Sequence, residues 1–224
     1  MSVVIPTYNE EVFIGRCLGA MVGQTVPADE IIVVNNNSTD RTAEIVKRFH
    51  IKMVKEKIQG MIPARNRGFD EAKYNIIARC DADVIVPNNW IELIKKNFGK
   101  KDIDALSGPV AYTDSPFITS SPIPSRVYLE SLRLLSKGNR YLVGPNMIVT
   151  KNIWKKVRDL VNPDDTVVHE DIDLSLKIVN IGGKIGYDAK LIVSSSARRI
   201  TGKPKSFFIE YPARVVNTFL VNKR

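Results

Sequence analysis

The chain has 224 residues, of which 44% are hydrophobic, and its 33 Lys and Arg against 24 Asp and Glu give a formal net charge of +9. These proportions exclude a disordered chain, and the length is enough to bury a core without disulfide bonds or structural metals. The charge favours a polyanionic partner such as a diphosphate or an anionic membrane, but scattered basic residues and the lack of a zinc-finger or aromatic RNA-binding signature disfavour nucleic acid.

The first hundred residues alternate between strand-like and helix-like patterns. Strands are predicted at residues 2–5, 30–34, 51–54 and 75–80, and helices at 10–22, 39–49 and 62–73. Asn9 and Ser38 are the predicted caps of the first two helices. This alternation predicts an α/β fold with a Rossmann-like, mostly parallel sheet, in which ligands bind beyond the carboxyl ends of the strands.

The second half is less regular. Strands are predicted at residues 103–110 and 141–150, and helices at 126–136 and 170–181, the latter ended by Gly182-Gly183. No linker long enough to separate two domains is present. We therefore expect one domain over residues 1–224, made of a first half (1–100), a second half (101–200) and a basic amphipathic tail (201–224).

The sequence also predicts where the protein works. Cys17 and Cys80 lie in apolar segments without a metal-ligand spacing, which suits a reducing compartment. No signal peptide is visible, and no apolar run approaches the roughly 20 residues of a membrane span. We expect a cytoplasmic protein, at most peripheral at the cytoplasmic face of the membrane.

Two aspartates follow the fourth predicted strand. Residues two apart in an extended chain point to the same side, so the carboxylates of Asp81 and Asp83 can face one point. Hard carboxylate oxygens suit Mg²⁺ or Mn²⁺, which neutralise a diphosphate. The alternative is a solvated, Asp-rich turn.

Together with three other loops, this motif resembles the family 2 glycosyltransferases, which have the GT-A fold. The four motifs, in chain order, are Val4-Ile-Pro-Thr-Tyr-Asn-Glu10, Ile31-Ile-Val-Val-Asn-Asn-Asn-Ser-Thr-Asp40, Ala64-Arg-Asn-Arg-Gly68 and Asp81-Ala-Asp83. The resemblance is close over the first hundred residues and looser as far as Arg199. It implies an inverting, metal-assisted transferase that moves a sugar from a UDP- or GDP-sugar to an acceptor hydroxyl or a lipid phosphate. It also implies that residues 1–100 are the nucleotide-sugar-binding half and residues 101–200 the acceptor-binding half.

The resemblance also implies roles on the donor side. Asn35 and Asn36 stand where the family has the aspartates that read the base, and Arg65 matches an arginine that approaches the phosphates, although a surface arginine is the alternative. Asp81 is expected near the ribose and the metal, with Asp83 as the main metal ligand. The remaining nucleotide contacts are expected from the first loop: Pro6, Thr7, Tyr8 and Glu10.

On the acceptor side, His169-Glu-Asp-Ile-Asp-Leu-Ser-Leu176 resembles the family's Glu-Asp motif, which makes Asp171 the general base beside Glu170. The alternative is that these acidic residues only complement the helix dipole. Gly144 and Asn146 are expected in an acceptor-side loop, or in a plain turn. Arg198 and Arg199 are expected to approach the diphosphate, or to form a solvated basic stretch. No dependable third metal ligand is found in the sequence: His50 lies in the wrong region, and nothing further supports His169 in this role.

Two other functions fit parts of the sequence. A nucleotidyltransferase also uses paired aspartates but needs a Gly-rich triphosphate loop, which is lacking after the first strand. A non-catalytic module that binds nucleic acid or lipid would not need the three aspartates. Residues 126–136 and 206–224 carry apolar side chains edged by cations, which suits an anionic membrane that presents a glycan or lipid-linked acceptor. Alternatively, they pack on the domain or on a second subunit, and Pro212 is expected to interrupt a tail helix.

Overall fold

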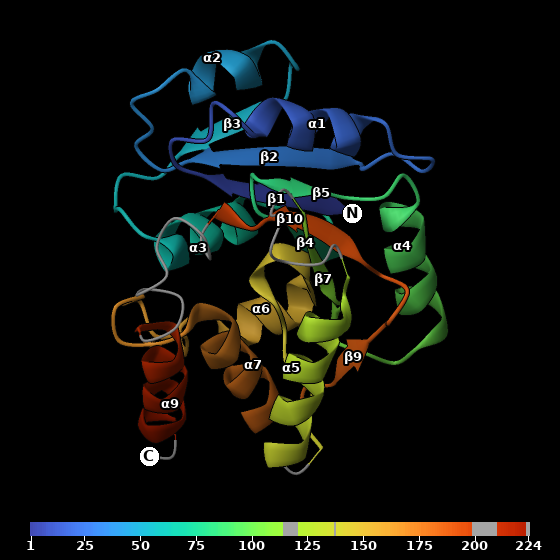
Figure 1. The fold of residues 1–224 in the computed structure, drawn as a ribbon, viewed down its shortest axis with the longest axis vertical. Helices are drawn as coiled ribbons and strands as arrows, with labels where there is room; N and C mark the ends of the chain where they lie inside the picture. Colours follow the sequence, from blue (N-terminus) through green and yellow to red (C-terminus); the bar gives the residue numbers. More distant parts are fainter. Residues whose placement is uncertain (114–120, 137, 199–209, 223–224) are drawn as a thin grey trace.

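The computed structural model describes residues 1–113, 121–136, 138–198 and 210–222 (Figure 1). Arg199 and the basic residues just after it therefore lie outside the described part of the chain. The elements, in chain order, are β1 (Ser2–Thr7), α1 (Ile14–Val22), β2 (Glu30–Asn35), α2 (Thr42–Lys47), β3 (Lys52–Lys55), α3 (Met61–Glu71), β4 (Ile76–Arg79), β5 (Val84–Ile85), α4 (Trp90–Lys100), β6 (Ala105–Ser107), β7 (Val110–Thr113), α5 (Ile123–Leu135), the 3₁₀ turn η1 (Gly144–Asn146), β8 (Met147–Thr150), α6 (Lys151–Val157), α7 (Glu170–Asn180), β9 (Ile185–Tyr187), β10 (Val193–Ser196) and α9 (Tyr211–Val221).

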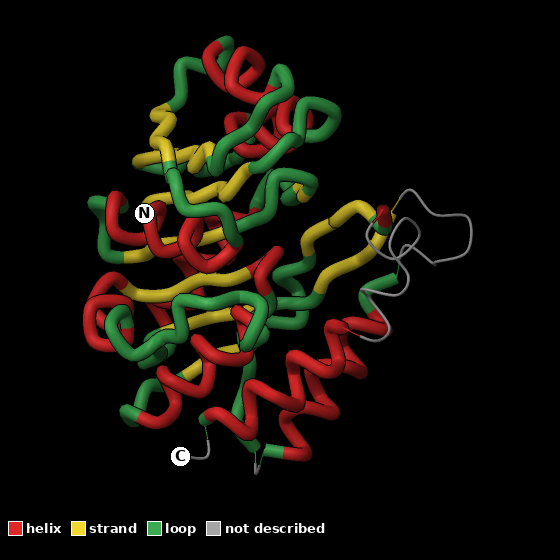
Figure 2. The backbone as a smooth tube through the Cα atoms, turned by 90° about the vertical axis from the view of Figure 1, so that its left-hand side faces the viewer, coloured by secondary structure: helices red, strands yellow, loops and turns green. Residues whose placement is uncertain are grey.

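The central sheet has seven strands in the order β3-β2-β1-β4-β8-β6-β9. The first four strands are parallel, as predicted, and β8 runs antiparallel to both of its neighbours. A second sheet has the order β5-β10-β7. The strands are stacked along the long axis of the molecule (Figure 2). The predicted α/β architecture with a mostly parallel sheet is confirmed.

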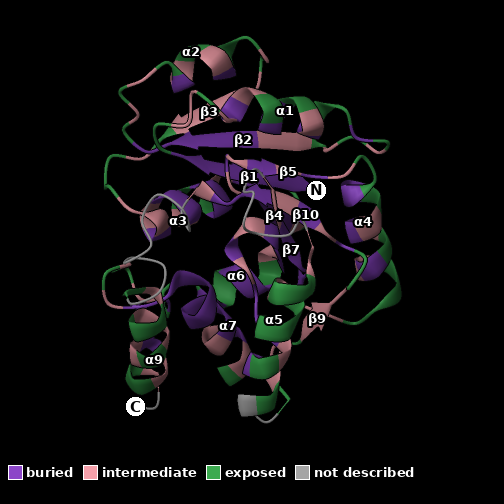
Figure 3. Cartoon of the chain, in the orientation of Figure 1, coloured by how far each residue is buried: buried purple, intermediate pink, exposed green. Residues whose placement is uncertain are grey.

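The two faces of the central sheet bury two apolar cores. Alternate residues of β1 point to opposite faces: Val3 and Ile5 join the core beneath α1 and α4, whereas Val4 joins the core beneath α3 and α6. Both faces are therefore covered, which explains the continuous apolar runs of these strands. Figure 3 shows the buried strands at the centre and exposed residues on the outer faces of the helices.

Helix α3 packs unusually close to the sheet. A Cβ atom at Gly68 would lie 2.2 Å from a methyl carbon of Val4 and 2.9 Å from one of Val34. Only glycine permits this approach, so the end of the motif that begins at Ala64 has a packing role.

The predicted helix caps are wrong. Asn9 has a φ of 52° and its side chain accepts a hydrogen bond from the Thr39 amide, while α1 begins only at Ile14. The Ser38 hydroxyl accepts from the Asn9 amide instead of capping α2. The two loops thus bind each other, and this contact between distant segments replaces the local caps.

The second half corrects several predicted elements. The strand predicted at 103–110 is two strands, β6 and β7, which belong to different sheets. A Cβ atom at Gly108 would lie 2.1 Å from the Leu191 carbonyl oxygen, so the chain turns here beneath another segment. Only the end of the strand predicted at 141–150 is β8, and helices α4 and α6 were not predicted. The end of α7 at Gly182, which has a φ of 81°, is confirmed.

The tail forms helix α9, and Pro212 lies in its first turn rather than interrupting it. Val215 and Phe219 pack against a small core that contains Leu132 and Ile172, so α9 packs on the domain, which was one of the two alternatives. In Figure 1, α5, α7 and α9 lie at the end of the molecule opposite α2. Across the described ranges, no helix combines the length and the apolar character needed to span a bilayer.

Candidate active site

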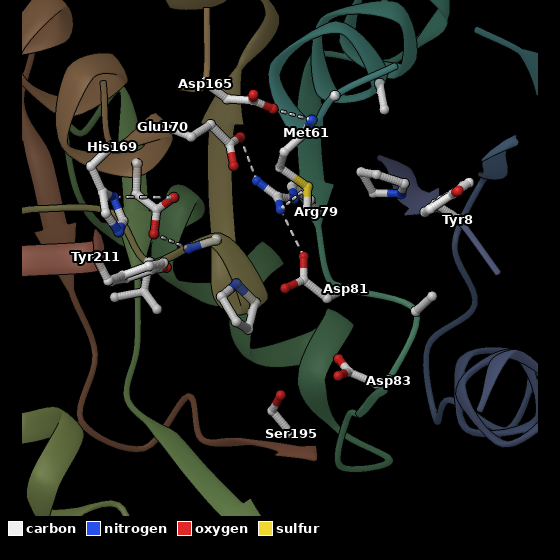
Figure 4. Close-up of a pocket in the computed structure, with 18 of the residues that line it drawn as sticks. Tyr8, Met61, Arg79, Asp81, Asp83, Asp165, His169, Glu170, Ser195 and Tyr211 are labelled. Carbon is white, nitrogen blue, oxygen red and sulfur yellow. Dashed lines mark hydrogen bonds and ion pairs between the residues drawn. The ribbon is translucent and has the colours of Figure 1, made fainter. Parts of the chain in front are cut away.

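A cavity of about 960 Å³ opens at the carboxyl ends of β1 and β4. Its walls come from both halves of the chain and from α9, and Figure 4 shows a part of its lining. Most of the predicted site residues lie on these walls: Pro6, Thr7, Tyr8, Glu10, Asn36, Asp81, Asp83, Gly144, Glu170, Asp171 and Arg198.

The loop after β1 forms the first wall. Its Tyr8 side chain is half exposed, and the Glu10 carboxylate forms an ion pair with Arg198. Asp40 supports this loop, because it accepts hydrogen bonds from the amides of Glu11 and Thr42. Burial by itself raises the pKa of the Asp40 carboxyl, but these hydrogen bonds outweigh it and lower the pKa below 3.8.

Asp81 and Asp83 lie in a turn between β4 and β5, where the Val84 amide donates to the Asp81 carbonyl oxygen. The extended backbone expected for this motif is therefore wrong, although both carboxylates line the cavity. Asp81 Oδ1 lies 2.7 Å from Arg79 Nη2, and Asp83 Oδ2 lies 3.2 Å from Arg198 Nε. The guanidinium of Arg198 thus lies between two acidic side chains, those of Asp83 and Glu10.

Three predicted site residues do not line the cavity. Asn35 Oδ1 accepts from the Ser38 amide, 2.9 Å away. Asn146 accepts from the Trp90 indole and donates to the Leu191 carbonyl oxygen. Arg65 is buried and its Nη1 lies 3.1 Å from Glu170 Oε1.

Asn36 does line the cavity, but its amide is engaged by the protein. Its nitrogen donates to the carbonyl oxygens of Glu56 and Ile58, and its oxygen accepts from the Gly60 amide. These bonds hold the segment that leads into α3. Asn36 therefore shapes the wall of the cavity through the loop that it binds.

Arg79, at the end of β4, was missed by the sequence analysis. It is only 1% exposed, and its guanidinium joins Asp81 to Glu170 Oε1, which is 2.5 Å from Nη1 (Figure 4). Burial alone lowers the pKa of Arg79, but attraction by Glu170 and Asp81 outweighs burial and raises it. For Arg65 the balance is opposite, and burial lowers the pKa despite Glu170. A basic residue at the end of an apolar strand, as in Ile76–Arg79, is the sequence feature that could have indicated a buried ion pair.

Asp171 lies at the start of α7 and lines the cavity. The side chain is buried, and Oδ2 accepts a hydrogen bond of 2.8 Å from the Gly144 amide. A Cβ atom at Gly144 would lie 3.3 Å from Asp171 Oδ1. The glycine thus lets the 3₁₀ turn approach and orient this carboxylate.

Helix α9 and the segment before α7 complete the wall of the cavity, and the sequence analysis did not predict this. Tyr211 and Arg214 line the cavity from α9. Asp165 Oδ2 accepts from the Met61 amide, 2.6 Å away, and so binds the start of α3. Arg214 in turn donates to the Asp165 carbonyl oxygen. These long-range contacts have no local pattern in the sequence.

Comparisons with known proteins agree with this architecture. Residues 2–158 match the profile of the family described as glycosyl transferase family 2. The chain is 31% identical over 208 residues to the probable glycosyltransferase YdaM of Bacillus subtilis, a match that covers 84% of this chain and 48% of that protein. The chain therefore spans about half the length of this relative.

Solved structures show the same fold. A mannosyltransferase from Pyrobaculum calidifontis, in complex with GDP-Man and Mn²⁺, matches with a TM-score of 0.75 at 20% identity, over 100% of this chain and 64% of that one. Glucosyl-3-phosphoglycerate synthase from Mycobacterium tuberculosis, in complex with Mn²⁺, UDP and phosphoglyceric acid, matches with a TM-score of 0.70 at 15% identity, over 99% and 77% of the two chains. The fold is the GT-A fold, and the chain belongs to glycosyl transferase family 2.

Proposed function

We propose that this chain is an inverting glycosyltransferase that transfers a sugar from a UDP- or GDP-sugar to an acceptor hydroxyl. The observation that carries the proposal is the meeting of two sets of carboxylates in one cavity. Asp81 and Asp83 come from the end of β4, and Asp171 comes from α7 across the cavity. The donor side is residues 1–100 and the acceptor side residues 101–200.

The donor set fits a divalent metal at Asp83, with Asp81 beside it. Mg²⁺ is commonly held by one or two protein carboxylates together with substrate phosphates, so a third protein ligand is not needed. Among the described residues, no group of three or more His, Cys, Asp or Glu side chains is placed so that it could hold a metal ion by itself. The Arg198 cation between Glu10 and Asp83 indicates that this corner of the cavity attracts positive charge. When bound, the metal would neutralise charge on the diphosphate leaving group.

The residues of this chain then act in one displacement. The Gly144 amide fixes Asp171 Oδ2, which leaves Oδ1 to accept the proton of the acceptor hydroxyl. The hydroxyl oxygen attacks the anomeric carbon from the face opposite the diphosphate, and the nucleoside diphosphate leaves. A single displacement inverts the configuration at that carbon. Arg79 forms ion pairs with both Asp81 and Glu170 and so holds these two side chains in place.

A thermal-shift screen tests the donor side of this proposal. UDP-glucose, UDP-N-acetylglucosamine and GDP-mannose are each added with and without Mg²⁺. A ligand at about 100 times its Kd stabilises a protein by about 2.7 kcal/mol, which for this length raises Tm by about 5–10 °C. We expect at least one sugar nucleotide to reach this shift only with the metal. The Asp83→Ala variant should lose the metal-dependent part.

The matched control is Asp159→Ala, because the Asp159 side chain is 86% exposed and lies outside the cavity lining. This variant should respond to the sugar nucleotide as the wild type does. A full metal-dependent shift in Asp83→Ala would remove Asp83 from the metal site. No shift with any sugar nucleotide would contradict the proposed function.

A further inference from the structure

A buried imidazole in the wall of the cavity is not used by the mechanism above. His169 precedes α7, is 5% exposed and lines the cavity. Among the described residues, neither of its ring nitrogens has a hydrogen-bond partner. Buried polar side-chain atoms are nearly always paired, because leaving one unpaired destabilises the folded protein. The ring therefore points to a ligand that pairs with it.

Helix α9 fixes the orientation of this ring. The His169 amide donates a hydrogen bond of 2.7 Å to the Thr218 hydroxyl, and the ring meets the Tyr211 ring edge to face, with centroids 4.2 Å apart. Figure 4 shows the two rings against each other on the acceptor side, across the cavity from Tyr8. The imidazole is thus held in place before any ligand binds.

The ring lies beside the proposed base. His169 Nδ1 is 4.0 Å from Asp171 Oδ1, which is too long for a direct hydrogen bond. Asp171 Oδ2 is already bound to the Gly144 amide, so Oδ1 is the oxygen that faces the imidazole. For an oxygen atom placed about 2.8 Å from both His169 Nδ1 and Asp171 Oδ1, the Nδ1–O–Oδ1 angle is about 90°. A hydroxyl accommodates this angle when it donates to one of the two atoms and accepts from the other.

We propose that His169 is an acceptor-binding residue, in that one acceptor hydroxyl donates its proton to Asp171 Oδ1 and accepts from His169 Nδ1–H. This proposal rests on the proposed function. In the reaction, the O–H bond breaks and its proton goes to Asp171. A lone pair of the same oxygen forms the new bond to the anomeric carbon. The bond from that carbon to the diphosphate oxygen breaks, and the nucleoside diphosphate takes its electron pair.

Together, His169 and Asp171 determine the chemical class of the acceptor. A phosphate monoester has a second pKa near 6, so at pH 7.5 or above it is mostly a dianion without a proton for Asp171. It would also place like charges next to each other. An alcohol or saccharide hydroxyl satisfies both His169 and Asp171. The geometry therefore favours a saccharide hydroxyl over a lipid phosphate as the acceptor.

Two substitutions at this position separate hydrogen bonding from packing. His169→Asn keeps an amide group close to the position of Nδ1, whereas His169→Leu keeps an apolar body without a donor. Nucleoside diphosphate release is measured with the sugar nucleotide found by the thermal-shift screen, using a panel of methyl glycosides and, separately, dodecyl phosphate. We expect transfer to a methyl glycoside. In His169→Leu, the acceptor KM should rise about 10-fold or more, whereas His169→Asn should retain most of the acceptor affinity.

Failure of the proposed role of His169 can be distinguished from failure of the proposed function. Donor affinity, measured by thermal shift, should stay within about twofold in both variants, since the ring is on the acceptor side. Failure of every sugar nucleotide to bind the wild type contradicts the proposed function. Transfer to dodecyl phosphate, or an unchanged acceptor KM in His169→Leu, overturns the role of His169.

A second measurement covers the case in which the donor binds but no acceptor of the panel is used. The chain has two histidines, His50 and His169, so the ring ¹⁵N signals of His169 can be assigned with the His50→Gln variant. Methyl glycosides are added in the presence of Mg²⁺ and the nucleoside diphosphate. A change in the His169 ring signals supports the proposal, and unchanged signals across the panel overturn it.

Discussion

Arg79 illustrates, at the scale of single residues, how one buried guanidinium pairs with two acidic side chains of the site. Its guanidinium lies between Glu170 and Asp81, and Glu170 also binds Arg65. Despite its burial, attraction by Glu170 and Asp81 raises the pKa of Arg79. Glu170 is next to Asp171 in the chain, so this network connects Asp81 to the segment that carries the proposed base.

Removing Arg79 tests the strength of this network. In Arg79→Met, Asp81 loses the charge that faces it and Glu170 keeps only Arg65. Breaking a buried pair from one side costs about 3–5 kcal/mol, so the free energy of unfolding should fall by about this amount in urea titrations. The control is Arg41→Met, because the Arg41–Glu11 pair is on the surface and should contribute less than about 1 kcal/mol.

Equal losses in the two variants would show that the Arg79 network contributes no more than a surface pair. If Arg79→Met does not fold, Arg79→Lys takes its place. A lysine keeps the charge but not the two-sided geometry of the guanidinium, so an intermediate loss is expected.

Prediction of site residues from the sequence succeeded where a residue of suitable chemistry also lies at the cavity. It failed where a residue of the same type is held by other parts of the protein and has a structural role. The motif aspartates Asp81, Asp83 and Asp171 line one cavity, the first two from the turn after β4 and the third from the start of α7. Asn35 and Arg65 were predicted from motif position alone. Their partners, Ser38 and Glu170, decide their role, and a partner 105 residues away has no local signature.

At the scale of secondary structure, α9 is joined to α7 by one buried hydroxyl. Thr218 is fully buried, accepts from the His169 amide and donates to the Arg214 carbonyl oxygen. The bond fixes the start of α7, where Asp171 lies. Helix α9 is therefore part of the cavity wall as well as a packing element.

Replacing the Thr218 hydroxyl tests whether its hydrogen bond holds α9 to the start of α7. Thr218→Val keeps the shape but leaves the His169 amide without its partner, which should cost about 1–3 kcal/mol of unfolding free energy. Val216→Thr is the matched control, since Val216 is 60% exposed on the same helix and should change stability by less than about 0.5 kcal/mol. A shift in the urea midpoint of Thr218→Val no larger than that of Val216→Thr would show that the hydroxyl does not join the helices.

Element prediction succeeded where the local pattern dominates. The four parallel strands and α3 follow from apolar runs bounded by polar loops, and all were placed to within a few residues. The failures share a tertiary cause. Asn9 and Ser38 are of residue types that commonly cap helices, but each forms its hydrogen bond with the other loop instead. Gly108 ends one strand because the backbone at Leu191 passes close above it.

At the scale of the whole molecule, one sheet brings together residues from both halves of the chain. Strand β4 pairs with β1 on one side and with β8 on the other, so the loops after β1 and β4 face the turn that precedes β8. The parallel half could be predicted because each strand is followed by its crossover helix. The antiparallel insertion of β8 and the second sheet could not, because their pairing depends on contacts between segments far apart in sequence.

The central claim is that Asp171 is the base for a donor held on the other side of the cavity. The most direct measurement compares donor binding and sugar transfer in Asp171→Asn, which keeps the size and loses the proton acceptor. We expect the sugar nucleotide to raise Tm as in the wild type, while nucleoside diphosphate release with a methyl glycoside falls by about 100-fold or more. Asp159→Asn, on the surface, should change neither. Undiminished transfer in Asp171→Asn, or loss of donor binding in that variant, would contradict the account.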